Sequence, residues 1–324
     1  MKIYFIRHGE TEHNVAQLLA GITDSRLTQH GILQTQRLGA HLTAKDLRFT
    51  HIFASDLQRA FMTAQAIADV QFRKYDGTKL EVVRLAHLRE QDFGSNEMVP
   101  WNSKRGQDSF FDRTPDTSQP GYVPKESVDA MKKRAKAFMD DFIVPLLATN
   151  EEETVAVVSH GLFLGVLWRN FLARFGPKSV SLSPNVVGNN YGADFSPEHH
   201  IAIWANTAYL EVEIQRTSTL SEAVNAHKPE PSNVKSRPHG LSDWEMVIKT
   251  INGQEHIRGF KKIRGGVANV AHDPKQKDIA GFFKKPAAEH ENAVETGEVL
   301  ERALDTEIEA QQGQEVSPMG GVLR

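Results

Sequence analysis

The chain has 324 residues, of which 40% are hydrophobic, and its formal net charge is −3 at pH 7. This length and composition are sufficient for one large domain with an extension, or for two modest domains. The absence of cysteine excludes disulfides, thiolate metal sites and cysteine nucleophiles. No apolar run approaches the ~20 residues of a membrane-spanning helix. We therefore expect a soluble protein of the cytoplasm or the nucleus, with no signal peptide and no membrane partner.

Strand-like hydrophobic runs alternate with segments of helical periodicity along the first two thirds of the chain. This alternation predicts an α/β fold in three layers, with a sheet of mostly parallel strands and helices on both faces. The predicted strands lie at residues 2–6, 51–54, 80–84, 154–158 and 201–214, and the clearest helical segments at residues 55–68, 128–146 and 161–175.

Polar stretches interrupt this pattern and then replace it. Residues 93–125 are rich in Pro, Gly, Asp and Ser, and they are long enough to form a lid or specificity insertion. Residues 176–200 have the same irregular character. We therefore predict a catalytic domain over residues 1–218 and a largely irregular C-terminal tail over residues 219–324, with a short ordered element at 244–251.

Two of the predicted strands lead into a histidine that is followed by glycine. Arg7-His8-Gly9 follows the first hydrophobic run, and Ser159-His160-Gly161 follows the run at 154–158. The carboxyl ends of parallel strands form the edge at which open α/β sheets bind ligands. The repeated arrangement predicts that His8 and His160 share one site.

Other polar residues follow neighbouring elements and extend this site. Arg59 lies on the first turn of a predicted helix, where a guanidinium and the positive helix start together favour an anion. Glu90 follows a strand-like run and supplies a carboxylate, with Asp92 and Glu97 as nearby alternatives. Asn14 follows the Arg7-His8-Gly9 turn, where it either caps a helix or contacts the same anion.

Five motifs of this chain together resemble the histidine phosphatase superfamily, which is also called phosphoglycerate mutase-like. The resemblance covers approximately residues 1–215, and it is specific because the five motifs agree in order and in approximate spacing. The motifs are RHGETEHN at 7–14, GITDSRLTQHG at 21–31, SDLQRAFMTA at 55–64, LREQDFGSNE at 88–97 and VVSHG at 157–161.

The resemblance implies a role for each candidate residue. His8 would be the phosphorylated nucleophile, and Glu90 would donate a proton to the leaving oxygen. The residues implied to hold the phosphoryl group are Arg7, Asn14, Arg59 and His160. His8 must attack as neutral imidazole, and the surrounding cations favour that form. Arg7, Arg59 and a protonated His160 would stabilise the transferring phosphoryl group, so we expect neither a metal nor another cofactor.

The residues after Glu90 distinguish two reactions. Mutases of the superfamily typically follow the acid with a basic, aromatic stretch, whereas Gln91-Asp92-Phe93-Gly94 resembles the phosphatase branch. We therefore predict hydrolysis of a phosphate monoester, carried by a small molecule or a phosphopeptide, through phosphohistidine on His8. A phosphoglycerate-type mutase is the alternative.

The tail carries a further motif at residues 276–283. This segment fits the pattern Q-x-x-[ILM]-x-x-[FY]-[FY] and resembles the PIP box, the peptide with which replication and repair proteins bind the sliding clamp (PCNA). The residues that carry the resemblance are Gln276, Ile279, Phe282 and Phe283. The alternative is an apolar turn that packs on the catalytic domain. A clamp-associated adaptor that uses the phosphatase fold as a scaffold is a further hypothesis.

Basic residues surround this motif. Residues 249–285 contain nine Lys and Arg residues and three acidic residues. Such a segment is capable of contacting nucleic acid or directing nuclear import.

Overall fold

The first strand, β1 (Lys2–Arg7), lies at the centre of the sheet, and residues Ile3–Ile6 are buried. The computed structural model describes residues 1–75, 77, 80–101, 120–149, 152–176, 178–187, 204–217, 241–261 and 267–272. Within these residues, seven strands form one sheet in the order β3-β2-β4-β1-β6-β7-β5. The other strands are β2 (His51–Ser55), β3 (Val82–Leu85), β4 (Thr154–Ser159), β5 (Val180–Leu182), β6 (Tyr209–Arg216) and β7 (Trp244–Gly253).

The strand directions agree with the predicted fold class. β1 pairs in parallel with β4, β4 with β2, β2 with β3, and β5 with β7. β6 is antiparallel to both β1 and β7. The sheet is therefore mostly parallel, as the alternation of strand-like and helical segments predicted.

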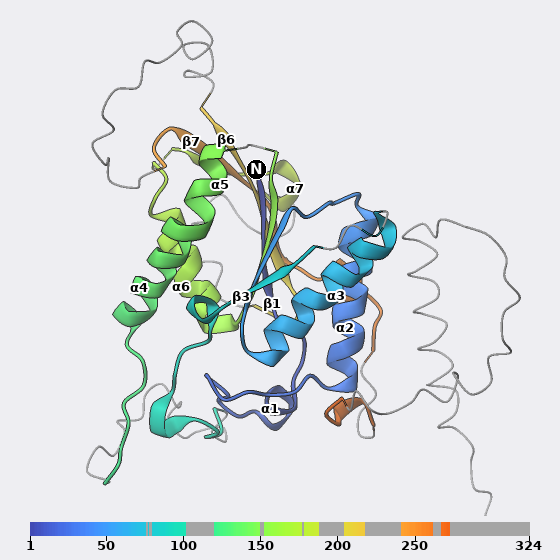
Figure 1. Cartoon of the computed structure of the whole chain (residues 1–324), viewed down its shortest axis with the longest axis vertical. Helices are drawn as coiled ribbons and strands as arrows, with labels where there is room; N and C mark the ends of the chain where they lie inside the picture. The colour runs from blue at the N-terminus through green and yellow to red at the C-terminus, as the bar shows by residue number, and fades with distance from the viewer. Residues whose placement is uncertain are drawn as a thin grey trace, which may run out of the picture.

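Helices cover both faces of the sheet (Figure 1). The helices are α2 (Gln29–Ala44) and α3 (Gln58–Lys74) on one face, and α4 (Val128–Phe138), α5 (Val144–Thr149) and α6 (Gly161–Leu172) on the other. The period of two along β1 explains this division, because alternate side chains point to opposite faces. Ile3 and Phe5 pack in the core with α4 and α6, whereas Tyr4 and Ile6 pack in the core with α2 and α3.

Short elements connect these layers. The segment predicted as one helix at 128–146 consists of α4, a π-helical turn and α5. The short elements are α1 (Glu12–Ala16), α7 (Pro184–Val187), the π-helical turn η4 (Met139–Ile143) and the 3₁₀ turns η1 (Ala86–Leu88), η2 (Gly94–Asn96), η5 (Glu255–Ile257) and η6 (Val267–Asn269). The prediction that 176–200 is irregular was incomplete, because β5 and α7 lie within it. Both are too short to show a periodicity.

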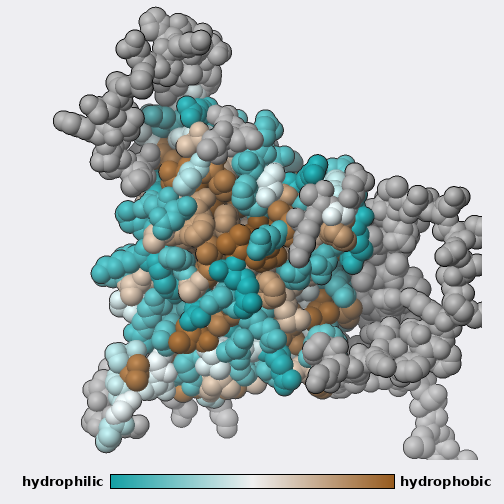
Figure 2. All heavy atoms as spheres, viewed as in Figure 1, coloured by the Kyte–Doolittle hydropathy of each residue, from teal (hydrophilic) through white to brown (hydrophobic). Residues whose placement is uncertain are grey.

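The distribution of polar side chains follows the layers. On the face shown in Figure 2, hydrophobic residues gather in the middle, between the two helical layers, and hydrophilic residues cover the outer sides. In the part of the chain that the structure describes, no helix has the length and apolar character needed to cross a membrane.

The sheet does not end at the boundary predicted near residue 218. β7 lies beyond that residue and pairs with β6 from Arg216↔Trp244 to Tyr209↔Gly253. Its alternating side chains Trp244, Met246 and Ile248 are buried. This period of two is typical of a strand, but a long polar interval separates β7 from the rest of the sheet in the sequence. The predicted ordered element at 244–251 is therefore part of the sheet.

Residues after β7 contact the N-terminal half of the chain. Phe260 stacks on His30 of α2, with 4.5 Å between the ring centroids. Ala271 forms an isolated bridge with Thr28, and the His272 backbone N–H donates to the Leu27 carbonyl oxygen. The predicted clamp-binding residues at 276–283 lie outside the described residues, as do residues 102–119 of the predicted insertion.

Candidate active site

The parallel pairing of β1 and β4 brings the two predicted histidines together. Arg7 lies opposite Ser159 in the register of these strands, so His8 and His160 leave the sheet side by side. The His8 backbone N–H donates to the Ser159 carbonyl oxygen at 3.0 Å. The centroids of the two imidazole rings are 5.1 Å apart. The structure therefore brings the two predicted histidines together at one edge of the sheet.

A backbone hydrogen bond orients the His8 ring. Nδ1 lies 2.7 Å from the Gly9 carbonyl oxygen, which only accepts, so Nδ1 carries the hydrogen and Nε2 keeps its lone pair. The side chain is buried. Burial, followed by the charges of Arg59 and Arg7, lowers the pKa of His8 well below its ordinary value. His8 is therefore a neutral imidazole whose Nε2 is available as a nucleophile.

Arg59, at the start of α3, connects His160 to the loop that contains Gly21 and Thr23. Its Nε donates to His160 Nδ1 at 3.1 Å, and its two terminal nitrogens donate to the carbonyl oxygens of Thr23 (3.0 Å) and Gly21 (2.6 Å). Burial lowers the pKa of Arg59 to about 10, which leaves the guanidinium charged at neutral pH. These bonds hold a buried cation next to both histidines.

The loop that accepts from Arg59 is itself fixed by Glu97. The Glu97 carboxylate accepts from the backbone N–H groups of Ile22 (3.1 Å), Thr23 (2.9 Å) and Phe93 (2.9 Å). Gly21 has a φ of 51°, and a Cβ there would lie 1.7 Å from a Glu97 carboxylate oxygen. The close approach therefore requires glycine, and Glu97 is committed to the loop.

His160 is neutral, which corrects the expectation of a protonated side chain. Its Nδ1 accepts from Arg59, so the ring hydrogen is on Nε2. Burial, followed by the charge of Arg59, lowers the pKa of His160 well below its ordinary value. Nε2 is buried and has no hydrogen-bond partner among the described residues. His160 therefore offers a neutral N–H donor, because the adjacent guanidinium already supplies the positive charge.

Arg7 and Asn14 complete the predicted anion-binding group. Arg7 donates through one terminal nitrogen to the Trp204 carbonyl oxygen, and burial lowers its pKa. Asn14 lies in α1, where its Oδ1 accepts from the Thr11 backbone N–H (3.2 Å) and from Asn206 Nδ2 (3.1 Å). Asn14 also lines the central cavity. Its side chain thus takes part in the helix cap while its amide nitrogen remains a donor for an anion.

Glu90 is bound to the start of α6 through backbone donors. Oε1 accepts from the N–H groups of Gln91 and Phe163, both at 2.9 Å, and Oε2 accepts from Leu162 at 3.0 Å. Oε2 therefore retains one acceptor position. Glu90 lines the cavity, whereas the alternative Asp92 accepts from the Gly94 backbone N–H. Of the three carboxylates considered, Glu90 is the one that lines the same cavity as His8.

These residues surround a cavity of about 310 Å³. Arg7 and Arg59 are the only cationic side chains among the described residues that line it. The rest of the lining is largely apolar, and its larger side chains are Leu18, Leu19, Phe93, Trp101, Leu162 and Trp204. This apolar wall could not be predicted from the sequence, because none of these side chains has a chemical signature beyond hydrophobicity.

In the described ranges, no group of three or more His, Cys, Asp or Glu residues is placed to hold a metal ion. The adjacent histidines His199 and His200, which by themselves indicate a metal site only weakly, lie outside these ranges.

Comparison with known proteins agrees with this geometry. The profile of the histidine phosphatase superfamily (branch 1) matches residues 3–182. The chain belongs to this superfamily. The protein is therefore an enzyme of a superfamily whose named relatives are phosphatases and phosphoglycerate mutases.

Two curated relatives of this chain have names of different kinds. The chain is 34% identical over 173 residues to the "Probable phosphoglycerate mutase GpmB" of Proteus mirabilis, which covers 52% of this chain and 73% of that protein. It is 27% identical over 283 residues to the "Probable phosphatase C1620.13" of Schizosaccharomyces pombe, which covers 86% of this chain and 79% of that protein.

A solved structure is also similar. Phosphoserine phosphatase from Entamoeba histolytica, in complex with 3-phosphoglyceric acid, has a TM-score of 0.47 and 21% sequence identity and covers 79% of this chain and 98% of its own.

Proposed function

We propose that this enzyme hydrolyses a phosphate monoester through a phosphohistidine intermediate on His8. The observation that carries the proposal is the His8 Nδ1 to Gly9 hydrogen bond of 2.7 Å, since it leaves Nε2 unprotonated beside two arginines and a carboxyl group. Nucleophile, anion-binding cations and proton donor meet at one cavity, which is the arrangement that phosphoryl transfer requires.

The first step transfers the phosphoryl group to the enzyme. His8 Nε2 forms a bond to phosphorus as the bond between phosphorus and the leaving oxygen breaks. Glu90 gives a proton from Oε2 to that oxygen, because an alkoxide is a poor leaving group at neutral pH. Arg7, Arg59 and the His160 Nε2–H stabilise the equatorial phosphoryl oxygens.

The second step returns the enzyme to its starting state. Glu90, now a carboxylate, takes a proton from water while the water oxygen attacks phosphorus. The N–P bond breaks, inorganic phosphate leaves, and His8 is again neutral. One glutamate therefore serves as acid and then as base.

The cavity favours hydrolysis over the mutase reaction. A phosphoglycerate carries a carboxylate as well as its phosphate, and the described lining holds no cation beyond the two arginines assigned to the phosphoryl group. The apolar wall instead suits a leaving group with aliphatic or aromatic surface, on a small molecule or a peptide. Appearance of inorganic phosphate rather than an isomerised sugar acid distinguishes hydrolase from mutase.

The intermediate provides the direct test. Brief incubation with ³²P-labelled substrate, followed by denaturation, should leave label on wild-type protein that is stable in base and labile in acid, as expected for phosphohistidine. The His8→Ala variant should carry no label under the same conditions. Label that persists in this variant, or a wild-type protein that turns over without trapped label at any quench time, would contradict the proposal.

For residues 276–283 we propose sliding-clamp binding, which is supported by the sequence motif. A peptide spanning residues 270–290 should bind purified sliding clamp in calorimetric titration, because Ile279, Phe282 and Phe283 match the hydrophobic positions of the motif. The matched peptide with Phe282→Ala and Phe283→Ala should bind at least about tenfold more weakly. Equal binding of both peptides would refute this recruitment role. The complete catalytic set favours an active enzyme over a scaffold.

A further inference from the structure

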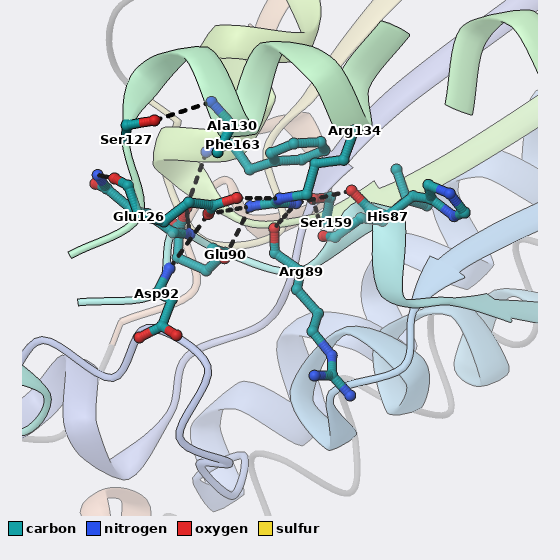
Figure 3. A network of polar contacts seen from close by, with 12 residues as sticks. His87, Arg89, Glu90, Asp92, Glu126, Ser127, Ala130, Arg134, Ser159 and Phe163 are labelled. Carbon is teal, nitrogen blue, oxygen red and sulfur yellow. Dashed lines mark hydrogen bonds and ion pairs between the residues drawn. The ribbon is translucent and has the colours of Figure 1, made fainter. Parts of the chain in front are cut away.

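A single guanidinium from α4 binds the backbone around Glu90. Arg134 Nη1 donates to the carbonyl oxygens of His87 (2.8 Å) and Arg89 (2.7 Å), and Nη2 donates to that of Glu90 (3.0 Å) (Figure 3). The intervening carbonyl, that of Leu88, accepts from Ser159 Oγ at 2.7 Å. Side chains therefore donate hydrogen bonds to the four consecutive carbonyl groups of residues 87–90, which follow β3 and are not part of a strand.

Glu126 holds the guanidinium in this orientation. Its two carboxylate oxygens accept from Arg134 Nε (2.7 Å) and Nη2 (2.8 Å), a bidentate geometry that fixes the plane of the guanidinium. The Glu126 backbone also donates to the Asp92 carbonyl oxygen at 2.7 Å and accepts from Gln91 Nε2 at 2.7 Å. Arg134 and Glu126 together form hydrogen bonds with residues on both sides of Glu90 in the chain.

Arg134 also contacts the residue that binds the Glu90 carboxylate. Its guanidinium carbon lies 4.1 Å from the centroid of the Phe163 ring. The Phe163 backbone N–H donates to Glu90 Oε1 at 2.9 Å. The Arg134 side chain thus contacts both the backbone of Glu90 and the residue at the start of α6 that binds the Glu90 carboxylate.

We infer that Arg134 is the positioning residue for the acid of the reaction, an inference that rests on the role proposed for Glu90. All five N–H groups of Arg134 are used in the five bonds described, and lysine has three donors on one atom and no planar fork. Arg134 does not line the cavity, so it acts through Glu90 rather than on the substrate.

Leaving-group dependence tests this inference. In Arg134→Gln, we expect kcat/KM for an alkyl phosphate to fall about 100-fold, because a displacement near 1 Å at a proton donor has an effect of that order. For p-nitrophenyl phosphate, whose leaving group needs no protonation, kcat/KM should fall at most about threefold. Arg134→Lys and Glu126→Gln should show the same selective loss with smaller magnitude.

Arg174 provides a matched control in the same helical layer. Its Nη1 pairs with Asp140 Oδ1 at 2.6 Å, and Nη2 donates to the Lys136 carbonyl oxygen at 3.3 Å. The Arg174 side chain is 9% exposed and that of Asp140 is 15% exposed, so Arg174→Gln also removes a partly buried ion pair. This variant should lose thermal stability without a difference between the two substrates.

The outcomes separate this inference from the proposed function. If wild-type protein forms phosphohistidine but the Arg134 and Glu126 variants lose activity equally on both substrates, or lose none, the positioning role is refuted. If Arg134→Gln does not fold, Arg134→Lys and Glu126→Gln test the positioning role instead. The measure is again the ratio of kcat/KM for the alkyl phosphate to kcat/KM for p-nitrophenyl phosphate. Absence of phosphohistidine in the wild type would refute the proposed function itself.

Discussion

The His8→Ala variant should lose catalytic activity by a factor on the order of 10⁴ or more, because removal of the nucleophile eliminates the covalent route. The effect should appear in kcat rather than in phosphate binding, since Arg7, Arg59 and the His160 donor remain in place. Steady-state kinetics with p-nitrophenyl phosphate would measure kcat, and competition by inorganic phosphate would measure anion binding.

His30 is a suitable control for this variant. It is also buried, but it stacks on Phe260 and does not line the cavity. His30→Ala should therefore lower the melting temperature and leave kcat within about threefold of wild type. If a His8→Ala protein keeps more than a few per cent of wild-type kcat, a group other than His8 accepts the phosphoryl group.

The second large effect is expected for Glu90→Gln. The amide cannot donate a carboxylic proton or accept one from water, so both chemical steps should slow by about 10²–10⁴-fold wherever proton transfer is needed. With p-nitrophenyl phosphate the first step needs no acid, and hydrolysis of the intermediate becomes limiting. Rapid-mixing measurements should therefore show a burst of nitrophenolate, and labelled phosphohistidine should accumulate above its wild-type level.

Asp92→Asn tests whether the nearby carboxylate contributes. Asp92 accepts from the Gly94 backbone N–H at 2.7 Å, and asparagine can keep that bond through its own oxygen. We expect kcat/KM for an alkyl phosphate to stay within about threefold of wild type in this variant. A loss as large as that of Glu90→Gln, or a Glu90→Gln protein without a burst, would remove Glu90 from its assigned role.

Much of the site could be predicted from the sequence because its residues follow regular elements. His8 and His160 come directly after buried strands, and parallel pairing requires that such residues share an edge. Arg59 lies on the first turn of a helix that follows the next strand in the sheet. In each case the periodicity of the element also fixes the position of the functional side chain.

Features that depend on contacts between distant segments could not be predicted from the sequence. Arg134 lies 44 residues from Glu90 in the sequence, and nothing in a helical period distinguishes it from other surface cations of α4. The neutral state of His160 depends on its burial and on the guanidinium of Arg59 beside it. β7 was placed outside the domain because a polar interval interrupts the pattern before it. Each of these facts is set by tertiary geometry, which no local pattern encodes.

The position of β7 determines how this enzyme should be divided for expression. A fragment that ends at residue 218 would leave the outer edge of β6 without its ladder, and an unpaired strand edge is a template for aggregation. It would also remove the bridge between Ala271 and Thr28, a residue that follows in the sequence the loop whose Gly21 and Thr23 carbonyls accept from Arg59. The shortest fragment that retains all described pairings of the sheet and this bridge extends to residue 272.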